Sequence, residues 1–223
     1  MSSEAGLGKN VLITGASRGI GLTFIQHLES QQCRRLDVQD DISIKFAAEE
    51  VQKILGDEPL NLLINNAGIF EIDSGVTMEN PNRATFLRHF DVNAVSYAIV
   101  TSVFLPLLLK AASLNQRALV VNISSFMASI EIGKLPPEDL GCSVVYGMSK
   151  AAQNRYTRVF GKKYVEEGII AIAINPGSVS TEMNPKGNVS ADDSIADMLR
   201  TFAKLKKEDA ALFIDRFGKP MPF

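Results

Sequence analysis

Short apolar runs alternate with amphipathic stretches along the whole chain. In the clearest runs, apolar residues stand together with few polar interruptions, and a glycine, asparagine or serine follows closely. These runs occupy residues 10–14, 60–64, 118–123 and 169–174. Such apolar character is typical of strands that are buried on both faces of a parallel sheet. Weaker runs predict two further short strands, at residues 33–38 and 211–215.

Apolar residues at spacings of three and four fill the intervals between these runs. They predict helices over residues 19–30, 42–55, 82–110, 143–166 and 190–205. Ser43 and Ser190 are candidate N-caps, and Pro106 is expected to kink the longest helix. Alternating strands and helices predict an α/β fold with a doubly wound, Rossmann-like parallel sheet in three α/β/α layers. No linker divides the chain, so residues 1–223 are expected to form a single domain.

The composition is that of an ordinary folded protein, with 46% hydrophobic and 22% charged residues. The net charge of −2 argues against a nucleic-acid partner, because such binding needs a basic surplus. The chain starts with no basic or strongly apolar leader, and its longest apolar stretch, residues 98–109, falls short of the ~20 residues of a membrane span. We therefore expect a cytoplasmic protein with no membrane partner, in which Cys33 and Cys142 are free thiols.

A glycine-rich segment, Thr14-Gly15-Ala16-Ser17-Arg18-Gly19-Ile20-Gly21, lies between the first predicted strand and the first predicted helix. Glycines let the backbone turn tightly and let a phosphate approach the helix N-terminus, where free N–H groups favour an anion. Many structural turns are also rich in glycine, but the strand–turn–helix context predicts a dinucleotide site. The candidate cofactor-binding residues here are Gly15, Ser17, Arg18, Gly19, Ile20 and Gly21.

Tyr146 and Lys150 are spaced so that both project from one face of a helix. A phenol with a pKa of ~10 is a poor acid–base catalyst at neutral pH, and a nearby ammonium group would lower that pKa. Tyr146 could then donate a proton to a carbonyl oxygen, or accept one in the reverse reaction. Taken alone, such a spacing favours an ordinary exposed helical pair over a catalytic one. No group of His, Cys and carboxylate residues has the spacing of a metal site.

Four later motifs strengthen the dinucleotide hypothesis, and three of them stand at the ends of predicted strands. They are Asn65-Asn66-Ala67-Gly68, Asn122-Ile123-Ser124-Ser125, Tyr146-Gly147-Met148-Ser149-Lys150 and Asn175-Pro176-Gly177. In this order, and over nearly its full length, the chain resembles the short-chain dehydrogenase/reductase family. Within that family it is most similar to the small carbonyl-reductase-like members of the sniffer and C-factor type.

The resemblance implies a role for each matching residue. Ser125 would hydrogen-bond the substrate oxygen, Tyr146 would transfer the proton, Lys150 would also hold the nicotinamide ribose, and Asn93 would support a proton-relay water. Further cofactor contacts would come from Asn66, Ala67, Gly68, Pro176, Gly177, Val179 and Thr181. The family also implies association through the two longest helices, so we expect a homodimer or homotetramer that acts on a small-molecule carbonyl or alcohol.

The chain departs from the family between Gly15 and Asp37, where a second strand and a second helix are missing. Arg18 resembles the basic residue of NADP-preferring members. Asp37, at about 20 residues beyond the glycines, could instead bond the ribose 2′-OH of NAD, whereas the family alignment would have it touch the adenine. Because the linker is short, we expect residues 33–38 to pair beside residues 10–14 in a six-stranded sheet, with Asp37 near the adenosine ribose.

The sequence thus predicts a carbonyl reductase that uses NADP(H), with NAD as the alternative cofactor. The competing hypothesis is a catalytically impaired member of the family that acts as a binding or regulatory protein. The missing segment motivates this alternative, and the presence of Ser125, Tyr146 and Lys150 argues against it. The short segment at residues 182–189 predicts an open site with broad substrate specificity.

Overall fold

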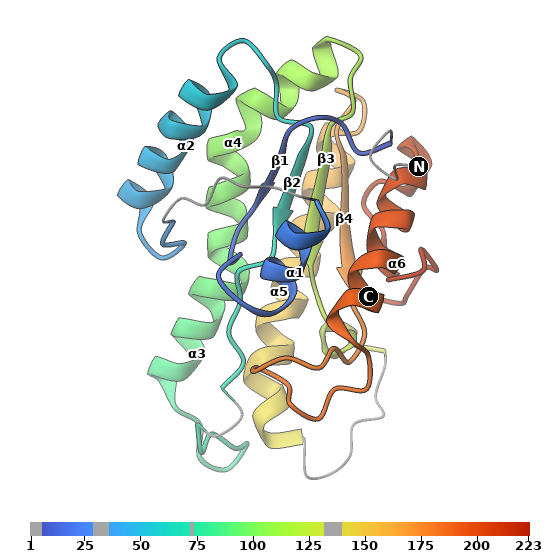
Figure 1. Cartoon of the computed structure of the whole chain (residues 1–223). Coiled ribbons are helices and arrows are strands. Elements are labelled where there is room, and N and C mark those ends of the chain that lie inside the picture. Colours follow the sequence, from blue (N-terminus) through green and yellow to red (C-terminus); the bar gives the residue numbers. More distant parts are fainter. Residues whose placement is uncertain (1–5, 29–35, 72–73, 132–139) are drawn as a thin grey trace.

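The computed structural model describes residues 6–28, 36–71, 74–131 and 140–223, which form a sheet between two layers of helices (Figure 1). The described sheet has five parallel strands, and their order in space is their order along the chain. They are β1 (Val11–Ile13), β2 (Leu62–Asn65), β3 (Leu119–Ile123), β4 (Ile170–Asn175) and β5 (Phe213–Asp215). Every residue of β2 and β3 is buried, as the continuous apolar runs predicted.

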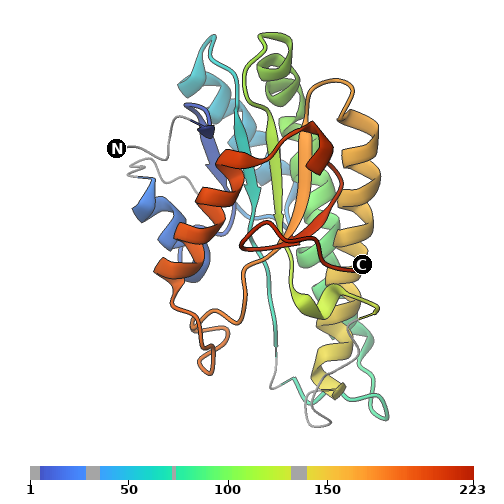
Figure 2. The ribbon, with the colours of Figure 1, turned by 90° about the vertical axis from the view of Figure 1, so that its right-hand side faces the viewer.

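Helices cover both faces of the sheet (Figure 2). One layer holds α1 (Gly19–His27) and α6 (Ala191–Lys204), whose Phe24 and Phe202 stack in the core on that face. The other layer holds α2 (Asp41–Leu55), α4 (Ser96–Ser113) and α5 (Leu140–Tyr164), which bury Ile44, Phe104 and Phe160 against the sheet. The doubly wound α/β fold expected from the sequence is confirmed.

The longest predicted helix is interrupted by a π-helical turn at Asp91–Val95, between α3 (Arg83–Phe90) and α4. Pro106 lies inside α4, which continues through it. The helical run Arg83–Ser113 is long and apolar enough to cross a membrane by length and composition alone, with a mean hydropathy of 1.9. Half of that apolar window is buried, and Val100 and Phe104 belong to the core. The core of the α/β fold therefore accounts for its apolar character.

The expected sixth strand is wrong for the part of it that the structure describes. Residues 36–38 form no strand, and residues 33–35 lie outside the described residues. The backbone N–H of Asp37 donates to Ser43 Oγ, and Asp37 Oδ1 accepts from the N–H of Gln39. These bonds turn the chain into α2 and use the polar groups that a strand would pair.

The beginning of α2 also differs from the prediction. Asp40 caps this helix, because its Oδ1 accepts from the N–H of Ile42 at 2.9 Å. Ser43, the expected cap, instead accepts the bond from Asp37. Since residues 36–38 do not pair with it, β1 is an edge strand of the described sheet, and all three of its residues are only partly buried.

Candidate active site

The strand ends bring the sequence motifs together. The described strands are parallel, so their carboxyl ends lie on the same side of the sheet. The segments that follow β1, β2, β3 and β4 therefore lie next to one another along these ends. These segments carry the glycine turn, Asn66-Ala67-Gly68, Ser125, and Pro176-Gly177. Tyr146 and Lys150 reach the same strand ends from α5, since Lys150 donates a hydrogen bond to the last residue of β3. The structure therefore assembles in one place the residues predicted from separate motifs.

The glycine turn requires its glycines for two physical reasons. Gly15 and Gly19 have φ angles of 65° and 53°, in the left-handed region that residues with a Cβ avoid. A Cβ on Gly15 would lie 2.7 Å from the Cα of Ala67, and a Cβ on Gly21 would lie 2.3 Å from the oxygen of Gly15. The turn is thus packed directly on the segment that follows β2.

Hydrogen bonds hold these two segments together. Thr14 Oγ1 accepts from the N–H groups of Asn66 and Ala67, at 3.0 and 3.1 Å. In return, Asn66 Nδ2 donates to the carbonyl oxygens of Thr14 and Gly15. Asn66 and Ala67 therefore fix the backbone at the start of the glycine turn. Thr14 is a structural residue that the sequence analysis did not single out.

The N-terminus of α1 is open to an anion. Its N-cap residue Arg18 has an extended backbone and makes no capping hydrogen bond with its side chain. The first N–H groups of the helix are thus left without a side-chain partner, which is the arrangement that binds phosphate in many proteins. Arg18 Nη1 lies 3.7 Å from Glu182 Oε2, and both side chains are mostly exposed. Asp37 is exposed as well, in the turn that leads into α2.

Tyr146, Ser125 and Lys150 form one cluster. The hydroxyl of Ser125 hydrogen-bonds the phenol of Tyr146. Lys150 Nζ donates to the carbonyl oxygen of Ile123 at 2.7 Å and to the phenol oxygen of Tyr97 at 3.2 Å. It also lies 6.0 Å from the centre of the Tyr146 ring. The serine, tyrosine and lysine predicted as a catalytic set are therefore neighbours in space.

Burial controls the protonation of this cluster. It raises the pKa of Tyr146 to about 12, against an opposing effect of the Ser125 hydrogen bond, and it lowers the pKa of Lys150 to about 7. The expectation that Lys150 lowers the pKa of Tyr146 is thus wrong for this structure, because desolvation outweighs any attraction by the amine. Tyr146 is therefore protonated at neutral pH, and in this structure it is a weaker acid than a free phenol.

Asn93 lies in the middle of the π-helical turn and is fully buried. Its Oδ1 accepts from the N–H of Ile69 at 2.9 Å, while its Nδ2 donates to the oxygens of Ile69 and Ser149. Phe70 follows Ile69 in the chain, and the centre of its ring lies 4.6 Å from the centre of the Tyr146 ring. Asn93 therefore braces the loop after β2 against α5 and so holds an aromatic ring on Tyr146.

Phe70 and Tyr97 are site residues that the sequence analysis missed. Phe70 stands two positions after the Asn-Ala-Gly motif, and Tyr97 stands one helical turn after Asn93. These spacings could have indicated both residues. The contacts themselves join segments far apart in the chain, so periodicity alone could not reveal them.

Comparisons with known proteins identify the family of this chain. A family model described as "short chain dehydrogenase" matches residues 29–191. C-signal of Myxococcus xanthus is 34% identical over 170 residues, which cover 74% of this chain and 93% of that protein. Retinol dehydrogenase 12 of Mus musculus is 30% identical over 212 residues, or 79% of this chain and 63% of that protein.

Solved structures give the same result. An NADPH-bound carbonyl reductase from chicken fatty liver is 34% identical, with a TM-score of 0.87 over 96% of this chain and 98% of that one. The putative carbonyl reductase Sniffer of Caenorhabditis elegans is 30% identical, with a TM-score of 0.83 over 97% of this chain and 99% of that one. Carbonyl reductase Sniffer of Drosophila melanogaster, at 23% identity and a TM-score of 0.87 over 96% and 99%, shares the fold.

Proposed function

Because the chain belongs to the short-chain dehydrogenase family of oxidoreductases, we propose that it is an NADP(H)-dependent carbonyl reductase. It would reduce a ketone or an aldehyde to the alcohol, with Tyr146 as the proton donor. The observation that carries the proposal is the cluster of Ser125, Tyr146 and Lys150, in which the Ser125 hydroxyl and the Lys150 amine both lie beside Tyr146. The NADPH-bound carbonyl reductase among the similar structures supports the choice of reaction and cofactor.

The residues around the glycine turn fit a dinucleotide. The uncapped N-terminus of α1 offers N–H donors to a pyrophosphate, and Gly15 and Gly19, whose positive φ angles favour glycine, place no side chain at their positions in the turn. Arg18 would attract the 2′-phosphate that distinguishes NADP from NAD. When bound, the cofactor supplies the hydride, and all other steps are performed by side chains of this chain.

Each side chain of the cluster has a distinct task. Ser125 and Tyr146 already share a hydrogen bond, so a carbonyl oxygen that accepts from both hydroxyls would replace that bond. The oxygen gains negative charge as the hydride arrives, and the protonated Tyr146 donates its proton to it. Lys150, with its pKa near 7, is partly charged at neutral pH and stabilises the negative charge left on Tyr146.

A binding protein with impaired catalysis is the second candidate. The observation that favours it is the position of β1 at the edge of the described sheet, since the adenosine half of a dinucleotide would lose part of its support there. One experiment separates the two candidates. NADPH is titrated while its fluorescence is followed, and its oxidation is then measured with a panel of ketones and aldehydes. Oxidation that depends on a carbonyl compound supports the reductase, whereas binding without oxidation supports the alternative.

A further inference from the structure

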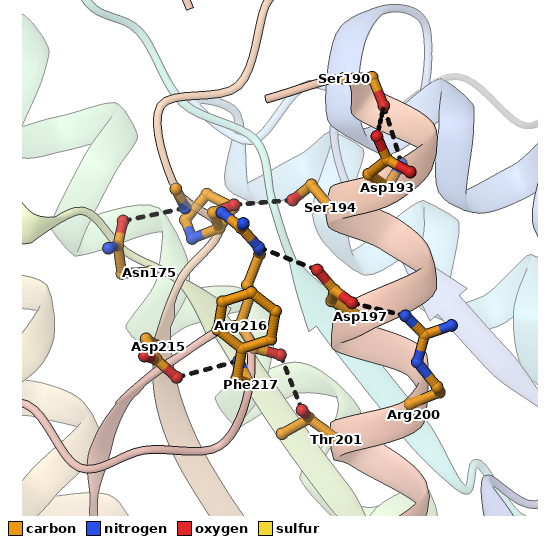
Figure 3. Close-up of polar contacts among 12 residues, drawn as sticks. Asn175, Ser190, Asp193, Ser194, Asp197, Arg200, Thr201, Asp215, Arg216 and Phe217 are labelled. Atoms are coloured by element: carbon orange, nitrogen blue, oxygen red, sulfur yellow. Dashed lines mark hydrogen bonds and ion pairs between the residues drawn. The ribbon is translucent and has the colours of Figure 1, made fainter. Parts of the chain in front are cut away.

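One face of α6 holds two segments at the edge of the sheet (Figure 3). Ser194, Asp197 and Thr201 share this face, because they are spaced by three and four residues. Ser194 Oγ donates to the carbonyl oxygen of Pro176 at 2.8 Å, and Thr201 Oγ1 donates to the carbonyl oxygen of Arg216 at 2.7 Å. The helix thereby fixes the loop after β4 and the turn after β5 relative to each other.

Arg216 fills the space beside Gly177. Its Nη1 lies 2.5 Å from the point that a Cβ on Gly177 would occupy. Gly177 also has a φ of 88°, a backbone conformation that residues with a Cβ avoid, and a side chain there would have to displace the Arg216 guanidinium. The guanidinium carbon lies 4.4 Å from the centre of the Phe217 ring, and the Arg216 side chain is 23% exposed. Arg216 is therefore packed between the Phe217 ring and the backbone of Gly177.

Asp197 fixes the orientation of Arg216. Its Oδ2 accepts from Arg216 Nε at 2.9 Å, while its Oδ1 accepts from Arg200 Nη2 at 2.5 Å. Asp197 and Arg216 are largely shielded, with side chains 15% and 23% exposed, whereas Arg200 is 61% exposed. The bond from Arg216 to Asp197 thus links α6 to Gly177. Arg200 binds the other oxygen of the same carboxylate from the solvent side, so its substitution is a matched control for that of Arg216.

We propose that Arg216 is a positioning residue, which holds the Pro176–Thr181 loop in the shape that receives the nicotinamide end of the cofactor. Gly177 is the second residue of this loop, in which the N–H of Val179 donates to the oxygen of Gly177 and the N–H of Ser180 donates to the oxygen of Val189. Loss of Arg216 opens space beside Gly177 and frees this backbone. The inference rests on the proposed function, because it assigns the loop to the cofactor.

The test uses NADPH binding to the whole protein, followed by fluorescence without any carbonyl substrate. We expect Arg216→Ala to weaken binding about tenfold, because the loop must be ordered when the cofactor binds. Arg216→Lys, which keeps the charge beside Asp197 but not the planar group beside Gly177, should lie between Ala and the unaltered protein. Arg200→Ala should stay within about twofold. Equal affinities for Arg216→Ala and Arg200→Ala would overturn the proposal.

Two further readouts separate positioning from a general loss of structure. Asp197→Asn keeps the volume of the side chain and should weaken NADPH binding in the same direction, with an unchanged circular dichroism spectrum. The second readout uses NADPH deuterated on one face of C4. Arg216→Ala should transfer a larger share of hydrogen from the C4 face that the unaltered protein does not use than Arg200→Ala does. A deuterium distribution identical to that of the unaltered protein would also contradict the proposal.

A double-mutant cycle tests the Gly177–Arg216 contact without any cofactor, so its result stands even if the unaltered protein binds no NADPH and the proposed function fails. In the unaltered background, Gly177→Ala is destabilised by two effects: its Cβ clashes with the Arg216 side chain, and its backbone has a positive φ. In the Arg216→Ala background only the strain remains, so Gly177→Ala should lower the Tm by a smaller amount. Equal decreases of Tm in the two backgrounds would show that the contact does not exist.

Discussion

The amine of Lys150 lies 3.2 Å from the phenol oxygen of Tyr97, and both side chains are almost fully buried. The amine also lies 5.0 Å from the centre of the Tyr97 ring. Tyr97 thus contacts Lys150 through its oxygen and its ring, and it helps to position the amine in the cluster with Ser125 and Tyr146. No family motif in the sequence analysis included this tyrosine.

Tyr97→Phe removes the hydrogen-bond acceptor and keeps the ring. The charged form of Lys150 loses a partner, so the pKa of Lys150 should fall further below its value of about 7. Since the charged form supports the reaction, the rate is lost as the pH rises through this pKa. We expect the alkaline limb of the kcat profile to move to lower pH, with about a three- to tenfold lower rate at pH 7.

Tyr156→Phe is the matched control for Tyr97→Phe. Burial raises the pKa of both tyrosines, that of Tyr156 to about 12, and Tyr156 is hydrogen-bonded to Thr101 instead of Lys150. Its substitution should leave the pH profile in place. If Tyr97→Phe shifts the profile no more than Tyr156→Phe does, Tyr97 has no role in positioning Lys150.

Lys150 should also make the stability of the protein depend on pH. Its pKa is about 7 in the folded protein and ~10.4 in an unfolded chain, so the unfolded chain binds more protons between these values. The unfolding free energy should therefore rise by about 1 kcal/mol per pH unit from pH 7 to 9 because of this group. Urea unfolding at pH 7, 8 and 9 measures the slope, which Lys150→Met should reduce. Identical slopes in the two proteins would refute the lowered pKa.

The apolar runs predicted the parallel sheet well, because a strand buried on both faces needs consecutive apolar residues, as in β3 and β4. They predicted the start of α2 poorly. Leu36 and Val38 were predicted to lie in a strand, yet they pack against the core cluster that contains Ile44 of α2. Between them, the N–H of Asp37 donates to Ser43 Oγ across a turn. Only the position of those polar groups in space separates the two outcomes.

The candidate site divides in the same way. Glycines, Ser125, Tyr146 and Lys150 could be found from motifs, since each occupies a fixed place after a strand or on a helix. The two hydrogen bonds between the Asn93 side chain and the backbone of Ile69 start from the π-helical turn. An apolar period of three and four residues does not distinguish such a turn from an α-helix. The raised pKa of Tyr146 likewise follows from burial, which requires the folded chain.

The preference for NADPH should depend on Arg18. Arg18→Ala removes the charge expected to attract the 2′-phosphate, so NADPH should bind about three- to tenfold more weakly. The affinity for NADH, which lacks this phosphate, should stay within about twofold and serves as the control. Fluorescence titration of both cofactors at low and high salt measures the effect. An unchanged ratio of the two affinities would remove Arg18 from the phosphate site.

We expect a homodimer or homotetramer that forms through α4 and α5. Val95, just before α4, and Met148 and Val159 on α5 are apolar and about half exposed, which favours burial in an interface. Light scattering at about ten micromolar protein should give two or four times the mass of one chain. Val159→Glu should shift the assembly toward smaller species. A monomer under these conditions would contradict the expectation.

The most direct test of the proposed reaction is the rate of carbonyl reduction by Tyr146→Phe. This change removes the transferable proton and keeps the ring that contacts Phe70, so the fold and the affinity for NADPH should be preserved. We expect kcat to fall at least 10²- to 10⁴-fold, which is the range for the loss of a general acid. A rate close to that of the unaltered protein would show that Tyr146 is not the proton donor and would contradict the account.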